Sequence, residues 1–330
     1  MILRQAAGCG LLRGPRPMFA SFLTTILFSL SVIFAARSAR MIGGARANLA
    51  RICIATCLLG IYALSLGQGI RGVSLPWFFL SGVIGFGLGD LALFGALPRI
   101  GPRLAILLTQ CLAAPIAAVA EWAWLGTMLR AADLACAAVI LGGVAIALAP
   151  DRGLGVDRRT FWIGVLCGIG SALGQAFGAV VSRKANDIAA LTNLPIDGGT
   201  AAFQRALGGV LLTALAFWLT RKKRALEDSA HPAVNWRAAA PVVAANALAG
   251  PTVGVGCYQW ALSTTPSGLV LPIIATSPLV TIVLSFFLEK LRPTRRAVLG
   301  GLVAVAGAVA LTDAQSGWTL ALALRNVLNF

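Results

Sequence analysis

The chain has 330 residues, of which 58% are hydrophobic and only 12% are charged, and its mean hydropathy is +0.86. Soluble domains contain roughly 45–50% apolar and about 25% charged residues, so the composition excludes an ordinary soluble globule, a coiled coil and a disordered chain. The formal charge of +16, from 27 Lys and Arg against 11 Asp and Glu, is better explained by basic loops between membrane spans than by nucleic-acid binding.

Ten apolar runs are long enough to cross a bilayer as helices, which takes about 20 residues. In chain order they lie at 18–37, 49–69, 75–98, 102–125, 132–150, 161–183, 200–220, 238–262, 266–290 and 295–313. The runs are continuous and rich in Leu, Ala and Gly, unlike the alternating strands of a membrane β-barrel. The sequence therefore predicts an all-α integral membrane protein with ten transmembrane helices, between an N-terminal segment (1–17) and a C-terminal tail (314–330).

The chain also reads as an internal duplication. Residues of three kinds recur at four slowly drifting offsets: Gly85 and Gly89 with Gly250 and Gly254 (offset 165), Pro115 with Pro278 (163), Arg51 with Arg205 (154), and Arg37 with Arg183 (146). These pairs predict a first five-helix repeat over 18–150, a linker over 151–160 and a second repeat over 161–313. Because five is odd, the second repeat must enter the membrane from the opposite side. Two inverted five-helix repeats are typical of alternating-access transporters, although some duplicated membrane proteins are scaffolds.

The run from residue 258 to 311 resembles the second repeat of the drug/metabolite transporter superfamily, EamA type. The matching parts are an aromatic-x-x-Ala-Leu end of the eighth span (258–262), Pro278 within the ninth span, Glu289 at its end and Gly300-Gly301 opening the last span. The first repeat shows the pattern more weakly from residue 89 onward, and Gly126 stands where the counterpart of Glu289 would fall. The resemblance implies a ten-span transporter whose substrate cavity is lined by polar residues of the middle spans.

Ionisable and amide side chains inside membrane spans are costly, so they are the first candidates for function. Asp90 lies about 6 Å past the middle of its span, at 1.5 Å per residue, and is the candidate for proton coupling. Glu121 is predicted to lie at the membrane interface, because it is followed by Trp122 and Trp124. The predicted substrate-binding residues are Asp90, Gln110, Gln175, Tyr258, Gln259, Thr276 and Ser277.

Small residues and prolines predict where helices pack closely or bend. Glycines spaced by four residues let helix backbones approach each other in lipid, either as static packing or as a surface that slides during transport. The residues assigned to packing or hinges are Gly85, Gly89, Pro115, Gly170, Gly174, Gly178, Gly250, Gly254 and Pro278. Arg51 and Arg205, which open two spans, are expected to reach the lipid headgroups.

These features favour a secondary transporter that moves a small metabolite, such as an amino acid, out of the cell by alternating access. Two alternatives stay open: a lipid-carrier or head-group flippase of the same fold, and a non-transporting membrane scaffold or sensor. The chain is not predicted to be an enzyme, because its one histidine, His231, lies in a charged loop and supplies neither a metal site nor a Ser–His pair. No cofactor or metal is expected.

The predicted partners are a small-molecule substrate and the lipid bilayer, without nucleic acid, for a monomer or homodimer. The predicted location is a bacterial inner membrane. With ten spans, nine of the 27 Lys and Arg residues lie on the side of the N-terminus and 18 on the other. The positive-inside rule then places both termini outside the cytoplasm, whereas the resembling family generally keeps them inside, and both orientations stay open.

Overall fold

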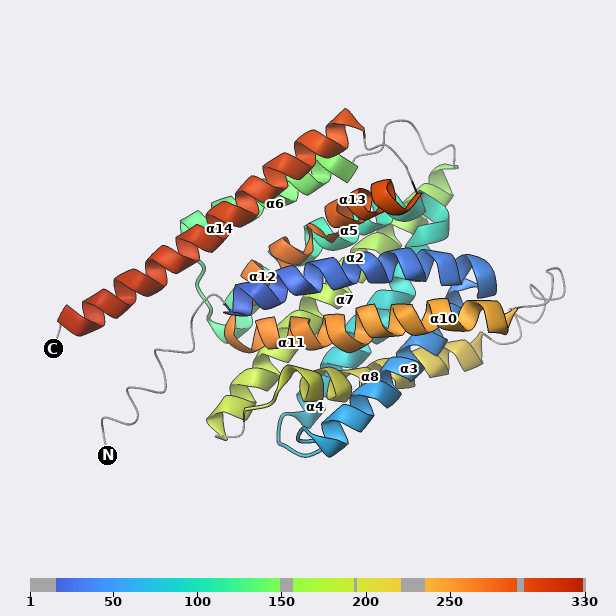
Figure 1. Cartoon of the computed structure of the whole chain (residues 1–330), viewed down its shortest axis with the longest axis horizontal. Helices are drawn as coiled ribbons and strands as arrows, with labels where there is room; N and C mark the ends of the chain where they lie inside the picture. Colours follow the sequence, from blue (N-terminus) through green and yellow to red (C-terminus); the bar gives the residue numbers. More distant parts are fainter. Residues whose placement is uncertain (1–15, 149–156, 193–194, 221–234, 290–293, 329–330) are drawn as a thin grey trace.

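The computed structural model describes residues 16–148, 157–192, 195–220, 235–289 and 294–328, and within these ranges the regular structure is helical (Figure 1). The first half contains α2 (Arg16–Ile42), α3 (Gly44–Ser65), α4 (Leu75–Gly82), the π-helical segment η1 (Val83–Gly89), α5 (Asp90–Leu125) and α6 (Ala131–Leu148). The second half contains α7 (Arg158–Leu191), α8 (Gly198–Leu219), α10 (Trp236–Ala247), the π-helical segment η2 (Leu248–Gly254), α11 (Val255–Thr264), α12 (Ser267–Ile274), α13 (Ser277–Glu289) and α14 (Arg295–Leu328). The predicted all-α class is confirmed.

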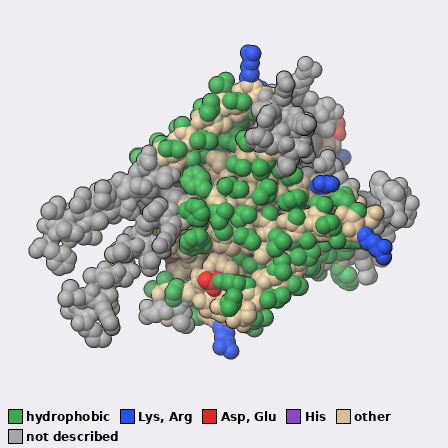
Figure 2. Space-filling model, viewed as in Figure 1, with side chains coloured by type: hydrophobic (Ala, Val, Ile, Leu, Met, Phe, Trp, Pro, Cys, Tyr) green, Lys and Arg blue, Asp and Glu red, His purple; other side chains and the backbone are tan. Residues whose placement is uncertain are grey.

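Seven helical stretches in the described residues are long and apolar enough to cross a membrane. Two shorter apolar stretches, Ala131–Ala147 and Ser267–Thr281, correspond to the predicted fifth and ninth spans. The predicted tenth span lies in α14, which continues to Leu328, past residue 313 where that span was expected to end. Figure 2 shows a surface covered by hydrophobic side chains, with the visible Lys and Arg side chains toward its margins. The predicted multi-span membrane character is therefore confirmed.

The predicted third and fourth spans meet inside one helical stretch. α5 is helical throughout its 36 residues, although the sequence predicts a loop over residues 99–101. Its contacts with glycines of α7 run, in order along α5, as Ala92 with Gly170, Ile100 with Gly164 and Leu108 with Gly168. From Ala92 to Ile100 the contacted glycine lies nearer to the start of α7, and from Ile100 to Leu108 it lies nearer to its end again. This order requires α5 to turn back between Ile100 and Leu108, so the two spans are distinct.

Two pairs of elements recur at the offsets that the sequence predicts. α3 and α8 each have 22 residues, and both their first and their last residues are 154 positions apart. η1 and η2 each have seven residues and lie 165 positions apart. Single-turn π segments are rare and are frequent at functional sites. The two segments are therefore matched in length and share the offset of the glycine pairs that they contain.

Corresponding helices of the two halves pack against each other in opposite directions. In α3 and α8, Gly60 faces Phe203 while Gly199 faces Tyr62, so one helix ascends as the other descends. α6 and α14 are antiparallel as well, because Ile140 contacts Gly307 while Gly143, later on α6, contacts Gly300, earlier on α14. The two helices form a pair at the edge of the bundle (Figure 1). α5 and α12 are also antiparallel, because Ala118 contacts Gly268 while Ala113, Ala114 and Ala117 share a core with Leu271 and Ile274.

Gly89 and Gly174 bring η1 and α7 into backbone contact. A Cβ on Gly174 would lie 2.6 Å from the Cα of Gly89, whereas a Cβ on Gly170 would lie 3.5 Å from the Cβ of Ala92. The first distance forces the two helices apart, and the second is an ordinary van der Waals contact. The predicted packing role is thus tied to particular glycines of the α7 series.

We expect Gly174→Ala to destabilise the protein by about 1–3 kcal/mol, as overpacked cores generally are. Gly170→Ala, four residues earlier on the same helix, is the matched control. It is expected to be neutral or stabilising by up to about 1 kcal/mol, because alanine is the better helix former. Thermal unfolding of both variants in detergent measures the difference. An equal effect of the two substitutions would contradict the close-approach argument.

The predicted ninth span is broken into α12 and α13 just before Pro278. Proline at position 278 removes the donor that would bond to the carbonyl of Ile274, and the Ser277 hydroxyl donates to that carbonyl instead, at 2.6 Å. Hydroxyls of α2 bind the neighbouring carbonyls: Thr25 donates to Ile273 at 3.2 Å and Ser29 to Ser277 at 2.7 Å. Pro115, by contrast, lies inside the continuous helix α5. The two prolines, predicted as equivalents, therefore differ in their effect on the backbone.

Candidate functional site

Asp90 and Arg51 form an ion pair between α5 and α3. The Arg51 guanidinium donates to the Asp90 carboxylate at 2.7 Å, and Arg51 Nε donates to Asn48 at 2.8 Å. The side chains of Arg51 and Asp90 are only 16% and 21% exposed. Asp90 follows η1 directly, so the π segment fixes where its carboxylate emerges. The arginine expected at the headgroups instead points to the acid on a neighbouring span.

Arg205 is buried near the middle of the bundle rather than at the headgroups. It is the eighth residue of α8, with 4% of its surface exposed. Its guanidinium carbon lies 5.0 Å from the ring centre of Phe86 and 5.5 Å from that of Tyr258. In the part of the chain that the structure describes, neither Nε nor Nη1 has a hydrogen-bond partner.

Two glycines make room for the Arg205 side chain. A Cβ on Gly85 of η1 would overlap the Nη2 atom of Arg205, and a Cβ on Gly178 of α7 would lie 3.1 Å from it. Gly85 and Gly178 also face each other, since the Gly178 Cβ position is 3.1 Å from the Gly85 Cα. These two predicted packing glycines therefore line the crevice that holds the guanidinium.

The predicted amides are placed in two separate hydrogen-bonded pairs. Gln175 of α7 donates to the side-chain oxygen of Gln110 of α5 at 3.1 Å. Gln259 of α11 is fully buried and donates to the Ser182 hydroxyl at 3.2 Å. The oxygen of Gln259 and the hydroxyl of Tyr258 have no partner among the described residues. Buried polar atoms without partners are costly, so these two atoms mark places where a ligand would be favoured.

Thr276 and Ser277 lie at the break between α12 and α13. Their hydroxyls donate to Ile273 and Ile274 of their own span, each at 2.6 Å. Such back-bonding satisfies the hydroxyl locally and stabilises an irregular backbone. The structure brings neither side chain to Arg205 or Asp90. Gly250 and Gly254, on η2, face α2, where a Cβ would meet Ser31 and Phe28 respectively.

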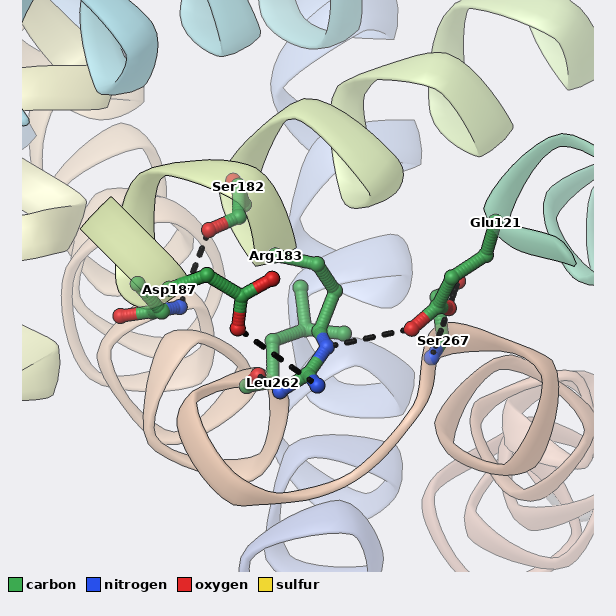
Figure 3. Close-up of polar contacts among 7 residues, drawn as sticks. Glu121, Ser182, Arg183, Asp187, Leu262 and Ser267 are labelled. Atoms are coloured by element: carbon green, nitrogen blue, oxygen red, sulfur yellow. Dashed lines mark hydrogen bonds and ion pairs between the residues drawn. The ribbon is translucent and has the colours of Figure 1, made fainter. Parts of the chain in front are cut away.

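A second buried polar network joins the ends of four spans (Figure 3). Glu121, near the end of α5, is 1% exposed, and its carboxylate lies 3.2 Å from Arg183 Nε. The same carboxylate accepts hydrogen bonds from the backbone N–H and hydroxyl of Ser267 at the start of α12. Arg183 also donates to the Leu262 carbonyl at 2.6 Å and lies 4.0 Å from Asp187.

The sequence predicted Glu121 as an acid at the membrane interface and did not predict that its side chain is buried between helices. The adjacent Trp122 and Trp124 are 54% and 48% exposed, as interfacial tryptophans are, but the acid points the other way, between helices. The carboxylate also accepts the free N–H of Ser267 at the start of α12, where the helix favours a negative charge. Glu121 and Arg183 together fasten α5, α7, α11 and α12 at one end of the bundle.

An apolar groove lies between α5 and α7. Its volume is about 680 Å³, and it is lined by Pro115, Ile116, Val119, Ala120, Ala123, Trp124 and Phe177. Val119 and Phe177 are 62% and 42% exposed, so the groove opens on the outer surface of the bundle. Its lining suits acyl chains rather than a polar solute.

Sequence reasoning missed the roles of Arg205, Arg183 and Phe86. One signal was present: Arg51 and Arg205 align at one offset, which is unexpected for residues that merely reach headgroups. The helices also begin earlier than predicted, at Gly44 and Gly198, so each arginine lies two turns inside its span. Hydropathy alone does not fix a helix start to within one turn.

Comparisons with known proteins agree with the fold and with the resemblance. Residues 162–312 match the model of the EamA-like transporter family. No curated protein matches the sequence. Among 29 similar chains of solved structures, one titled "Crystal structure of protein" covers 92% of this chain and 98% of its own, with a TM-score of 0.69 and 20% identity. That likeness supports the fold alone, and the family match shows that residues 162–312 are similar to the EamA-like transporter family.

Proposed function

We propose that the protein is a secondary transporter that carries a small polar metabolite across a membrane by alternating access. The observation that carries this proposal is the set of charges inside the apolar bundle: the Arg51–Asp90 pair and the unpaired Arg205, on α3, α5 and α8. Buried charges are expensive in a membrane and usually serve a solute or ion pathway. The substrate class suggested by the sequence, an amino acid or related solute moving outward, remains part of this proposal.

We further propose that the two halves are inverted copies. The matching elements α3 and α8, the matching π segments, and the antiparallel packing of corresponding helices all support this arrangement. An inverted pair provides two states of similar energy, each open to one side. In this scheme the Glu121–Arg183 network holds one end closed, because it ties together the ends of the spans that would have to separate.

Counterflow in proteoliposomes tests transport directly. Vesicles containing the purified full chain are loaded with one unlabelled metabolite at a time and exposed to the same compound in labelled form. We expect transient accumulation of label for at least one small polar compound, and none in protein-free vesicles. Failure to exchange any compound of a broad amino-acid and organic-acid panel would contradict transport and favour the scaffold alternative.

The flippase alternative has one observation in its favour, the apolar groove between α5 and α7. The same reconstituted vesicles distinguish it from solute transport when they contain a fluorescent lipid that dithionite bleaches in the outer leaflet. Bleaching beyond the outer-leaflet fraction, without solute counterflow, would favour lipid transport over the proposed function.

A further inference from the structure

The guanidinium of Arg205 is a buried positive charge that makes no direct ion pair with any described residue, although the charge of Asp90 acts on it from a greater distance. Among the described residues, no carboxylate lies within 4.0 Å of it, and its Nε and Nη1 donate to nothing. Phe86 and Tyr258 present their ring faces to it. Cation–π contacts recover only part of the cost of removing a guanidinium from water. A negatively charged group bound next to the Arg205 guanidinium would therefore be stabilising.

The proposed duplication indicates which group Arg205 lacks. Arg51 and Arg205 are each the eighth residue of a 22-residue helix. Arg51 has an acid, Asp90, which comes directly after η1. The residue directly after η2, 165 positions after Asp90, is Val255, whose exposed fraction is 3%. The second arginine thus occupies the position of the first, with valine in place of its aspartate.

We propose that Arg205 binds an oxyanion, a carboxylate or a phosphate, carried by the transported solute. This inference rests on the transport function proposed above and names the chemical class of the substrate. A planar guanidinium offers paired N–H donors that match the two oxygens of such a group. Arg51, Arg205 and Asp90 together carry a net charge of +1, which one singly charged oxyanion neutralises.

The surroundings specify more of the ligand than its charge. The Tyr258 hydroxyl lacks a partner among the described residues and supplies a further polar contact. The rings of Phe86 and Tyr258 suit an apolar or aromatic group next to the oxyanion. Gly85 matters only through the space it leaves, since each of the three atoms nearest its Cβ position belongs to Arg205. Gly85→Ala is therefore a second way to disturb the site, without removing its charge.

The test compares anions with neutral molecules of nearly the same shape. Thermal unfolding of the purified full chain in detergent is followed in benzoate against benzamide, and in glycerol 3-phosphate against glycerol, at constant ionic strength. We expect a saturable rise in Tm with at least one anion and none with its neutral partner, because a ligand stabilises the state that binds it. The arm that responds identifies carboxylate or phosphate as the preferred group.

Arg205→Met is expected to weaken the apparent Kd of that anion by tenfold or more, without lowering the Tm of the empty protein. If Arg205 had only a structural role, Arg205→Met would lower the Tm of the empty protein, and anions would not raise the Tm of the parent. Gly85→Ala is expected to weaken anion binding as well, and it carries the test if Arg205→Met does not fold. The controls are Gly256→Ala, where a Cβ meets nothing within 4 Å, and Arg159→Gln, which replaces an exposed arginine in the first turn of α7.

Three outcomes overturn the inference: no anion exceeds its neutral partner in the parent, Arg205→Met keeps the response, or Gly85→Ala binds the anion as the parent does. The transport proposal fails separately. Counterflow of neutral solutes alone would retain transport and reject the oxyanion site. Binding of anions without any counterflow would retain the site and reject transport.

Discussion

Arg183→Met is expected to lower the stability of the protein by about 3–5 kcal/mol, which is typical when one partner of a buried ion pair is removed. The substitution leaves the Glu121 carboxylate, 1% exposed, without the guanidinium that lies 3.2 Å away. It also removes the donor to the Leu262 carbonyl. The measurement is thermal or chemical unfolding of the purified variant in detergent.

Two controls separate the ion pair from its surroundings. Asp187→Asn removes the more distant acid, which is 47% exposed and 4.0 Å from Arg183, and should cost less than about 1 kcal/mol. The double variant Glu121→Gln/Arg183→Met should be more stable than Arg183→Met, because it leaves no unpaired charge. If the double variant were as unstable as the sum of the single variants, the two residues would not act as a pair.

Asp90→Asn is expected to slow counterflow by about 100-fold. The loss of the carboxylate leaves Arg51 without its ion-pair partner and removes the acid whose charge also acts on Arg205. A buried unpaired charge costs about 3 kcal/mol, and if the rate-limiting step bears this cost the rate falls by roughly two decades, at about 1.4 kcal/mol per decade. Counterflow in proteoliposomes measures the rate. Asp133→Asn is the matched control, since that acid is also buried but pairs with Arg130 outside the candidate site.

The same variant tests proton coupling. If Asp90 carries the coupled proton, the rate that remains in Asp90→Asn should no longer vary with pH, whereas the rate of Asp133→Asn should vary as in the parent. A variant that transports at a reduced rate but with the parental pH profile would remove Asp90 from any proton pathway. The Arg51–Asp90 pair would then serve to hold α3 against α5.

The sequence predicted most of the membrane-spanning helices because burial in lipid requires long apolar runs that nothing else in the chain imitates. The recurring glycines, Gly85 and Gly89 with Gly250 and Gly254, were predicted as packing positions, whereas the π segments η1 and η2 in which they lie were not predicted. The break before Pro278 was predicted only as a bend. Local sequence does not distinguish Pro278, which interrupts its helix, from Pro115, which does not. The hydroxyls that bind the carbonyls at the break come from Thr25 and Ser29, some 250 residues away.

The partners of the charged residues were harder to predict. Hydropathy reports how many polar residues a span contains but not which neighbour each one faces. Asp90 was identified as a residue that needs a partner, yet the partner depended on where α3 begins. Glu121 was assigned to the interface from its tryptophan neighbours, although residues adjacent in a helix point about 100° apart. Assigning these contacts required the packing of α5 against α7 and α12.

The unequal surroundings of Arg51 and Arg205 have a consequence for how such proteins evolve. In a symmetric dimer of identical subunits, an aspartate beside one arginine is repeated beside the other. Joining two copies in one chain removes that obligation, so each copy can change alone. In the duplication proposed here, one copy has Asp90 and the other has Val255 at the corresponding place. A fused chain can thus offer a different chemical group to each end of a molecule between its halves, and can fix the direction in which that molecule lies.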